Sequence, residues 1–194
     1  MQATSPTGST RRSCAFLCFG RVAGRKPSEA ANNFLTPIQE ALGCFLDGRV
    51  SVTTYDGHVP GVLTLNGGAP TPIIGSSKLT VQISIRYTIV ETEDPDRGPW
   101  KVNTDAWIHS LFEDEIETLG YHWHPVDTPD VLLPHLHYRK GREHLPTGRV
   151  LVEDLLRAAV EHGAKPRDAV RWEQIERDNR EAFKRGATWG AGPV

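Results

Sequence analysis

Apolar and polar residues alternate most regularly between positions 79 and 89. The apolar positions of this stretch are Leu79, Val81, Ile83, Ile85, Tyr87 and Ile89, and the residues between them are polar. A period of two predicts a strand with one buried face. Alternation resumes over 101–111, where Val102, Thr104, Ala106 and Ile108 share one side, and shorter β-like runs occupy 49–55 and 61–65. Two further strands, at 118–124 and 132–139, flank a turn-rich segment and are expected to pair as a hairpin.

Helical spacing appears near both ends of the chain. Apolar residues over 28–47 predict an N-terminal helix, in which Thr36-Pro37 fits an N-cap followed by a first-turn proline. Apolar residues at 152, 155, 156, 159 and 160 predict a second helix that ends at Gly163, and Pro166 suits the first turn of a third over 166–186. Strands followed by helices indicate an α+β fold: an antiparallel β-meander sheet with the N-terminal helix and two C-terminal helices packed on one face.

Length and charge define the domain organisation. A chain of 194 residues indicates one domain with tails. Residues 1–27 hold five basic residues and no acid, which predicts a disordered basic tail before a single domain over 28–186 and a flexible C-terminal tail over 187–194. The formal net charge of −2 gives no global reason to expect nucleic-acid or membrane binding, and no apolar run reaches the roughly 18–20 residues of a membrane span. A cytoplasmic location is expected, with Cys14, Cys18 and Cys44 as reduced thiols of no assigned role.

Half of the eight histidines fall in two His-x-His units on the predicted hairpin. These units are His122 with His124 and His135 with His137. Side chains two apart on a strand project to the same face, so pairing in register would bring four imidazoles within reach of one another. The aromatic and aliphatic residues between and beside them would then face the core. Arg139, His109 and Arg86 are candidates to join the histidine face.

Several kinds of chemistry fit such a face. His122, His124, His135 and His137 could bind a divalent metal such as zinc and leave an open position for water. Without a metal, a neutral and a protonated histidine could cleave a phosphodiester bond while Arg139 binds the phosphate. Segment 131–149 has four basic residues and one acid, which favours a phosphate-bearing substrate. A protein-docking surface, or histidines with a purely structural role, is the alternative.

Two neighbouring features are weaker candidates. The acidic run Glu113-Asp114-Glu115-Ile116-Glu117 could bind a cation, but it is expected to form a solvated turn. His144 could join the site, but its default place is a loop before Thr147 acting as a helix N-cap.

The order of β-meander, His-ending strand, short turn, Pro134-His135-Leu136-His137 segment and closing helix resembles the TumE-type toxins of prokaryotic toxin–antitoxin systems, over residues 79–162. The segment Tyr121-His122-Trp123-His124-Pro125 stands where that family carries an aromatic, Asp and His stretch. The Asp-Asn feature before the first His is missing, and the N-terminal and long C-terminal helices are additional. The resemblance implies a small intracellular effector that acts on RNA, as a ribonuclease, and is restrained by an antitoxin partner.

Overall fold

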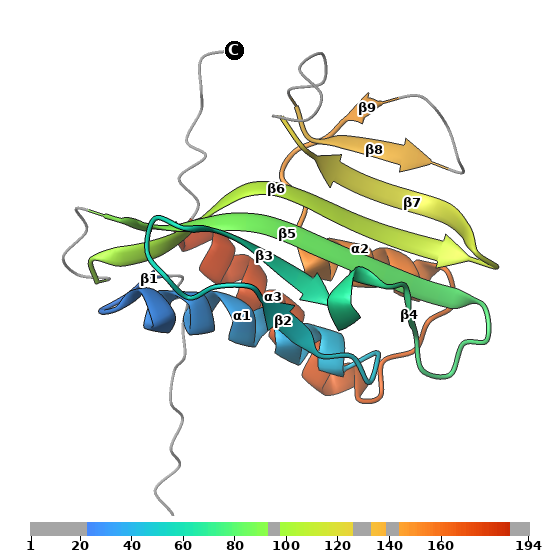
Figure 1. Ribbon diagram of the computed structural model, residues 1–194. Helices are drawn as coiled ribbons and strands as arrows, with labels where there is room; N and C mark the ends of the chain where they lie inside the picture. The colour runs from blue at the N-terminus through green and yellow to red at the C-terminus, as the bar shows by residue number, and fades with distance from the viewer. Residues whose placement is uncertain (1–22, 93–97, 126–132, 139–143, 187–194) are drawn as a thin grey trace, which may run out of the picture.

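A computed structural model of the chain describes residues 23–92, 98–125, 133–138 and 144–186 (Figure 1). In chain order the elements are β1 (Ala23–Gly24), α1 (Pro27–Gly43), β2 (Val50–Val52), β3 (Pro60–Leu65), the 3-10 turn η1 (Asn66–Gly68), β4 (Thr71–Pro72), β5 (Leu79–Glu91), β6 (Trp100–Glu113), β7 (Ile116–Trp123), β8 (His135–Tyr138), β9 (Leu145–Pro146), α2 (Val152–Glu161) and α3 (Ala169–Gly186). The predicted tails over 1–22 and 187–194, with Cys14 and Cys18, lie outside the described residues.

A single antiparallel sheet dominates the fold. Its strand order is β2-β3-β5-β6-β7-β8-β9, with β1 paired to β6 and β4 paired to β5. Strands from β5 onward are neighbours in sequence and in space, which confirms the predicted meander. Helices α1, α2 and α3 all pack on one face, here called the helix-covered face, and the other is the open face (Figure 1). The fold is therefore α+β, with the predicted N-terminal helix and two C-terminal helices.

The core lies between β5 and the helices. The alternating apolar residues of β5 that the sequence singled out are all at most 4% exposed. Against them pack Leu42 of α1, Leu155 and Leu156 of α2 and Trp172 of α3, each at most 2% exposed. Trp172 meets Phe45 edge to face, with 4.8 Å between ring centroids, so aromatic packing ties α3 to the end of α1. No described helix is both long and apolar enough to cross a membrane.

A β-bulge changes which residues of β6 face the core. Arg86 is paired with Ala106 but the next residue, Tyr87, is paired with Thr104, so Asp105 is an extra residue on β6. Before the bulge, Val102 lies opposite the buried Ile89, and after it Trp107 lies opposite the buried Ile85. The four residues predicted to share one side are therefore divided, and Ile108 is 38% exposed on the open face.

Helices α1 and α3 begin at residues other than those predicted from the sequence. Helix α1 begins at Pro27, so Pro37 lies inside the helix and Thr36 is not its N-cap. Residues Ala23 and Gly24, assigned to the basic tail on composition, form β1 and pair with β6. Helix α3 begins at Ala169, where the Asp168 carboxylate accepts the backbone N–H of Arg171 at 3.0 Å.

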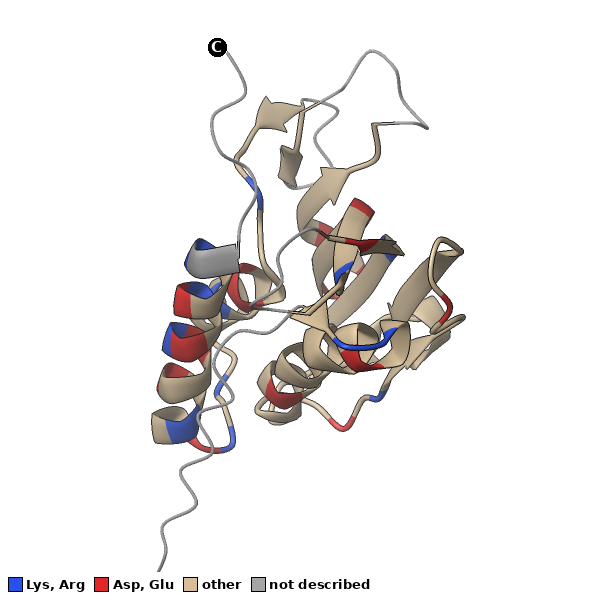
Figure 2. Cartoon of the chain, turned by 90° about the vertical axis from the view of Figure 1, so that its left-hand side faces the viewer, with Lys and Arg blue, Asp and Glu red and all other residues tan. Residues whose placement is uncertain are grey.

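The connection between the C-terminal helices follows the prediction more closely. Gly163 has a φ of +94° directly after α2, which is the left-handed conformation that a helix-ending glycine supplies. Lys, Arg, Asp and Glu alternate along α3 (Figure 2). Glu176 on α3 binds Arg180 one turn later and Arg157 on α2, so ion pairs join the two helices.

Candidate functional site

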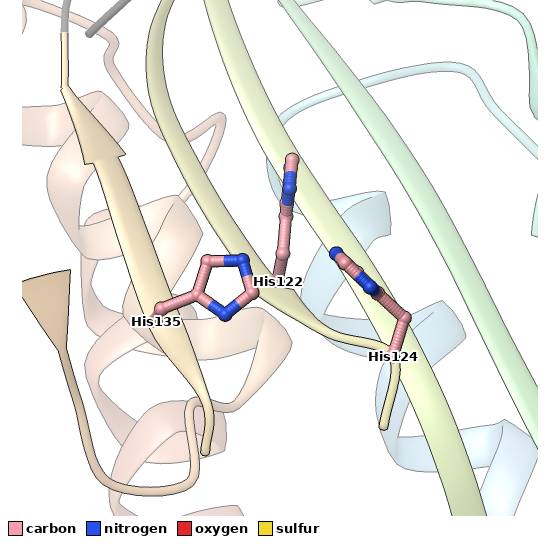
Figure 3. Close-up of side chains that lie close together, drawn as sticks. All are labelled: His122, His124 and His135. Carbon is pink, nitrogen blue, oxygen red and sulfur yellow. The ribbon is translucent and has the colours of Figure 1, made fainter. Parts of the chain in front are cut away.

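The predicted histidine hairpin forms, and its register gathers the imidazoles. Strands β7 and β8 are antiparallel, with His122 opposite His135 and Gly120 opposite His137. His122 and His124 from β7 and its end project to the same side as His135 from β8 (Figure 3). Ring centroids are 5.9 Å apart for His122 and His135 and 4.6 Å apart for His122 and His137. The sheet thus brings together all four histidines that the sequence singled out.

A fifth histidine completes the group. Strand β9 pairs with β8 so that Leu145 lies opposite Leu136, which sets His144 beside His137. The His144 ring centroid lies 4.6 Å from that of His135 and 4.7 Å from that of His137. His144 directly precedes β9, and Thr147 is not a helix N-cap, because α2 begins only after Leu151. The histidine cluster comprises His122, His124, His135, His137 and His144.

His135 lies at the centre of the histidine cluster and is 1% exposed. Its Nδ1 lies 3.1 Å from the backbone carbonyl oxygen of Leu133. A carbonyl only accepts hydrogen bonds, so Nδ1 carries the proton and Nε2 carries the lone pair. Nε2 is buried and has no hydrogen-bond partner among the described residues. Burial, together with the neighbouring imidazoles, lowers the pKa of His135 and favours its neutral form.

The carboxylate of Glu117 contacts the histidine cluster at His122. The Glu117 Oε1 lies 3.4 Å from His122 Nε2 and accepts a hydrogen bond of 2.6 Å from the Ser110 hydroxyl. The contact with His122 lowers the pKa of Glu117, so this residue stays ionised. Asp114 and Glu115 form the turn that the acidic run predicted, both with positive φ, but Glu117 points back to the histidines rather than into solvent.

Gly120 makes this contact possible. A Cβ at Gly120 would lie 2.5 Å from Glu117 Oε1 and 2.9 Å from His122 Nε2. Both distances are shorter than real Cβ contacts allow, so any larger residue would displace one of these side chains. Because Gly120 has no side chain, Glu117 and His122 can lie this close to each other.

The remaining sequence candidates do not join the histidine cluster in the described structure. Arg139 lies outside the described residues. His109 lies opposite Tyr121 and beside Trp107 on the helix-covered face, because the bulge in β6 turns it inward. Arg149 is half-buried there, where it donates a hydrogen bond to Thr104 and lies close to the rings of Trp107 and Phe183. Arg86 lies on the open face of β5, three strands from β8.

The nitrogen atoms are close enough to hold a metal ion. One ligand atom from each of His122, His124 and His135 lies within 4.8 Å of the others, and the same holds for His135, His137 and His144. Tetrahedral coordination at 2.0–2.1 Å places two nitrogens about 3.4 Å apart. The ligand atoms of either set would therefore have to approach one another by at most about 1.4 Å to reach that separation. Neutral imidazole is the form of histidine that binds metals, which suits the lowered pKa of His135.

Comparison with protein-family models, with curated proteins and with solved structures finds no match to this chain.

Proposed function

We propose that the histidine cluster is a divalent transition-metal centre and that the protein uses the ion to hydrolyse phosphodiester bonds. The observation that carries the proposal is the state of His135: a buried ring in contact with four more imidazoles, whose Nδ1 donates to a carbonyl and whose Nε2 has no hydrogen-bond partner among the described residues. Metal-binding histidines characteristically donate their other N–H to a carbonyl or carboxylate. His135 has this arrangement with Leu133.

The geometry favours a metal over a metal-free pair of histidines. Acid–base cleavage needs one protonated and one neutral imidazole on either side of a phosphate. Here the neighbouring rings are in contact, with centroids 4.6–6.1 Å apart, which leaves no space for a phosphate between two neighbours. Among the described residues, β8 and β9 carry no Lys or Arg and Arg149 is half-buried on the helix-covered face, whereas Arg139, Lys140 and Arg142 lie outside the described part of the chain. A bound cation would place positive charge directly at the histidine cluster, where a phosphate would bind.

The donor set suits zinc or a similar ion. Imidazole is a favoured ligand of Zn²⁺, and three such ligands with an open position are the arrangement of hydrolytic zinc sites. An ion bound in this way supplies Lewis acidity and a nucleophilic water near neutral pH. The chain's own residues orient the ligands. The Leu133 carbonyl fixes the tautomer of His135, and the Glu117 carboxylate is placed to accept a hydrogen bond from Nε2–H of His122.

RNA is the first substrate to test, because the resemblance to TumE-type toxins implies a ribonuclease with an antitoxin partner. The assay incubates the full-length protein, stripped of metal with EDTA and reloaded with Zn²⁺, with a labelled single-stranded RNA. The informative variant is His135→Asn, whose amide can still donate to Leu133 while the metal-binding nitrogen is lost. The matched control is His162→Gln, since His162 lies near Glu113 outside the histidine cluster.

The proposal predicts bound Zn²⁺ and Zn²⁺-dependent RNA cleavage in the wild type and in His162→Gln, and neither in His135→Asn. Zn²⁺ binding without cleavage would refute the ribonuclease activity and leave a metal-binding module. Failure of the wild type to bind Zn²⁺, Co²⁺ or Ni²⁺ would refute the metal centre itself.

A test in cells addresses the toxin-like role. Expression of the wild type in a bacterial host should arrest growth and degrade RNA, whereas His135→Asn at matched protein levels should do neither. Normal growth and intact RNA with the wild type would contradict an effector of this kind.

A further inference from the structure

The two possible metal-binding sets of the histidine cluster share one residue. One set adds His122 and His124 to His135 and the other adds His137 and His144, and His122 and His137 also contact each other across the two sets, with 4.6 Å between ring centroids. The His135 ring contacts the rings of all four other histidines. Among the described residues, no ring contact joins His122 to His144. The cluster is thus two overlapping three-histidine groups that meet at His135.

His135 can serve only one group at a time. Its Nδ1 proton is donated to Leu133, so Nε2 is the only nitrogen of this ring that can bind an ion. An imidazole nitrogen has a single lone pair and binds a single ion. Two ions, each with three histidine ligands, cannot be held together.

We infer that the site holds one ion per chain, in either of two overlapping positions that both use His135. The inner position adds His122 and His124, and the outer position adds His137 and the exposed His144. An ion that moves between them exchanges two ligands and keeps the third. This inference rests on the proposed metal centre.

The arrangement makes a specific prediction for single and double variants. His124→Ala disables the inner position and leaves the outer one complete, and His137→Ala does the reverse. Each single variant should therefore still bind one Zn²⁺. The double variant leaves His122, His135 and His144, which do not form one of the two sets. Its affinity for Zn²⁺ should therefore fall by about 100-fold or more, which exceeds the usual effect of losing a residue that only orients a metal ligand.

The experiment is a calorimetric titration of the metal-free, full-length protein with Zn²⁺, repeated with Co²⁺ so that the visible absorption reports a change of ligands. Circular dichroism verifies that each variant is folded, and His162→Gln is the control. The expected result is one equivalent for the wild type and for both single variants, with different Co²⁺ spectra for the two single variants, and severe loss for the double variant.

Three results would overturn the inference while leaving the metal centre in place. The first is tight binding of two Zn²⁺ ions per chain in the wild type, the second is loss of Zn²⁺ binding in either single variant, and the third is unchanged Zn²⁺ binding in the double variant. No binding in the folded wild type would instead refute the metal centre on which the inference rests.

Discussion

His109 offers a test of the packing between the sheet and the helices. The residue is 2% exposed, and neither of its ring nitrogens has a hydrogen-bond partner among the described residues. Burial is the largest cause that lowers its pKa from 6.5 to about 3, and the electrostatic influence of His122 and Arg149 contributes a smaller part of this lowering. His109 is therefore neutral in the folded protein at every pH near neutrality.

The shift makes His109 a source of acid sensitivity. Below pH 6.5 the unfolded chain binds a proton on this residue, whereas the folded protein does not until the pH approaches 3. Acidification therefore favours the unfolded state. Between about pH 7 and pH 5 this difference in proton binding lowers the free energy of unfolding by about 2 kcal/mol.

The perturbation is His109→Leu, which fills the same apolar site without a titratable group. Urea denaturation in EDTA at both pH values gives the free energy of unfolding for the wild type, for His109→Leu and for the control His162→Gln, at a half-buried histidine. The wild type and the control should lose about 2 kcal/mol more on acidification than His109→Leu. The leucine variant should be at least as stable at pH 7, because two unsatisfied buried nitrogens are removed. Equal losses in all three proteins would refute the buried, neutral state of His109.

Other predictions concern packing and the metal centre. Trp172→Ala should lower the free energy of unfolding by about 3–5 kcal/mol because it empties a buried aromatic site, whereas Val170→Ala on the same helix, 81% exposed, should change it little; urea denaturation measures both. Glu117→Gln should weaken Zn²⁺ binding about 10–100-fold in a titration, since the carboxylate orients a histidine ligand. Gly120→Ala should reproduce that loss by displacing Glu117, whereas Gly148→Ala, where a Cβ meets nothing within 4 Å, should not. Zn²⁺ at about 100 times its dissociation constant should stabilise the wild type by about 2.7 kcal/mol, and an unchanged melting temperature would contradict specific binding.

The features that the sequence predicted well are those with a strong local period. The alternation of β5 fixes which side chains are buried, and the structure confirms each of them. The two His-x-His units needed only a hairpin in register, because a period of two sets both imidazoles of each unit on one face. The register of His122 with His135 then follows from the pairing of two short strands.

The features that were missed depend on single residues or very short elements. One extra residue at Asp105 reverses the faces of β6, so His109 turns to the core although the local pattern of β6 suggests the opposite. Strand β9 has only two residues, so no periodicity marks His144 as a neighbour of His137. Glu117 lies in a run of acidic residues that predicts a solvated turn. Its contact with His122 depends on the space left by Gly120, which the sequence pattern does not indicate.

The most direct test of the metal centre is X-ray absorption spectroscopy of the Zn²⁺-loaded wild type at the zinc edge, with His135→Asn as the comparison. A zinc ion held by His135 and two further histidines should show three imidazole nitrogens at about 2.0–2.1 Å in the wild type and fewer imidazoles, or no retained zinc, in the variant. Zinc bound only through oxygen ligands, or the same imidazole count in both proteins, would contradict a metal centre built around His135.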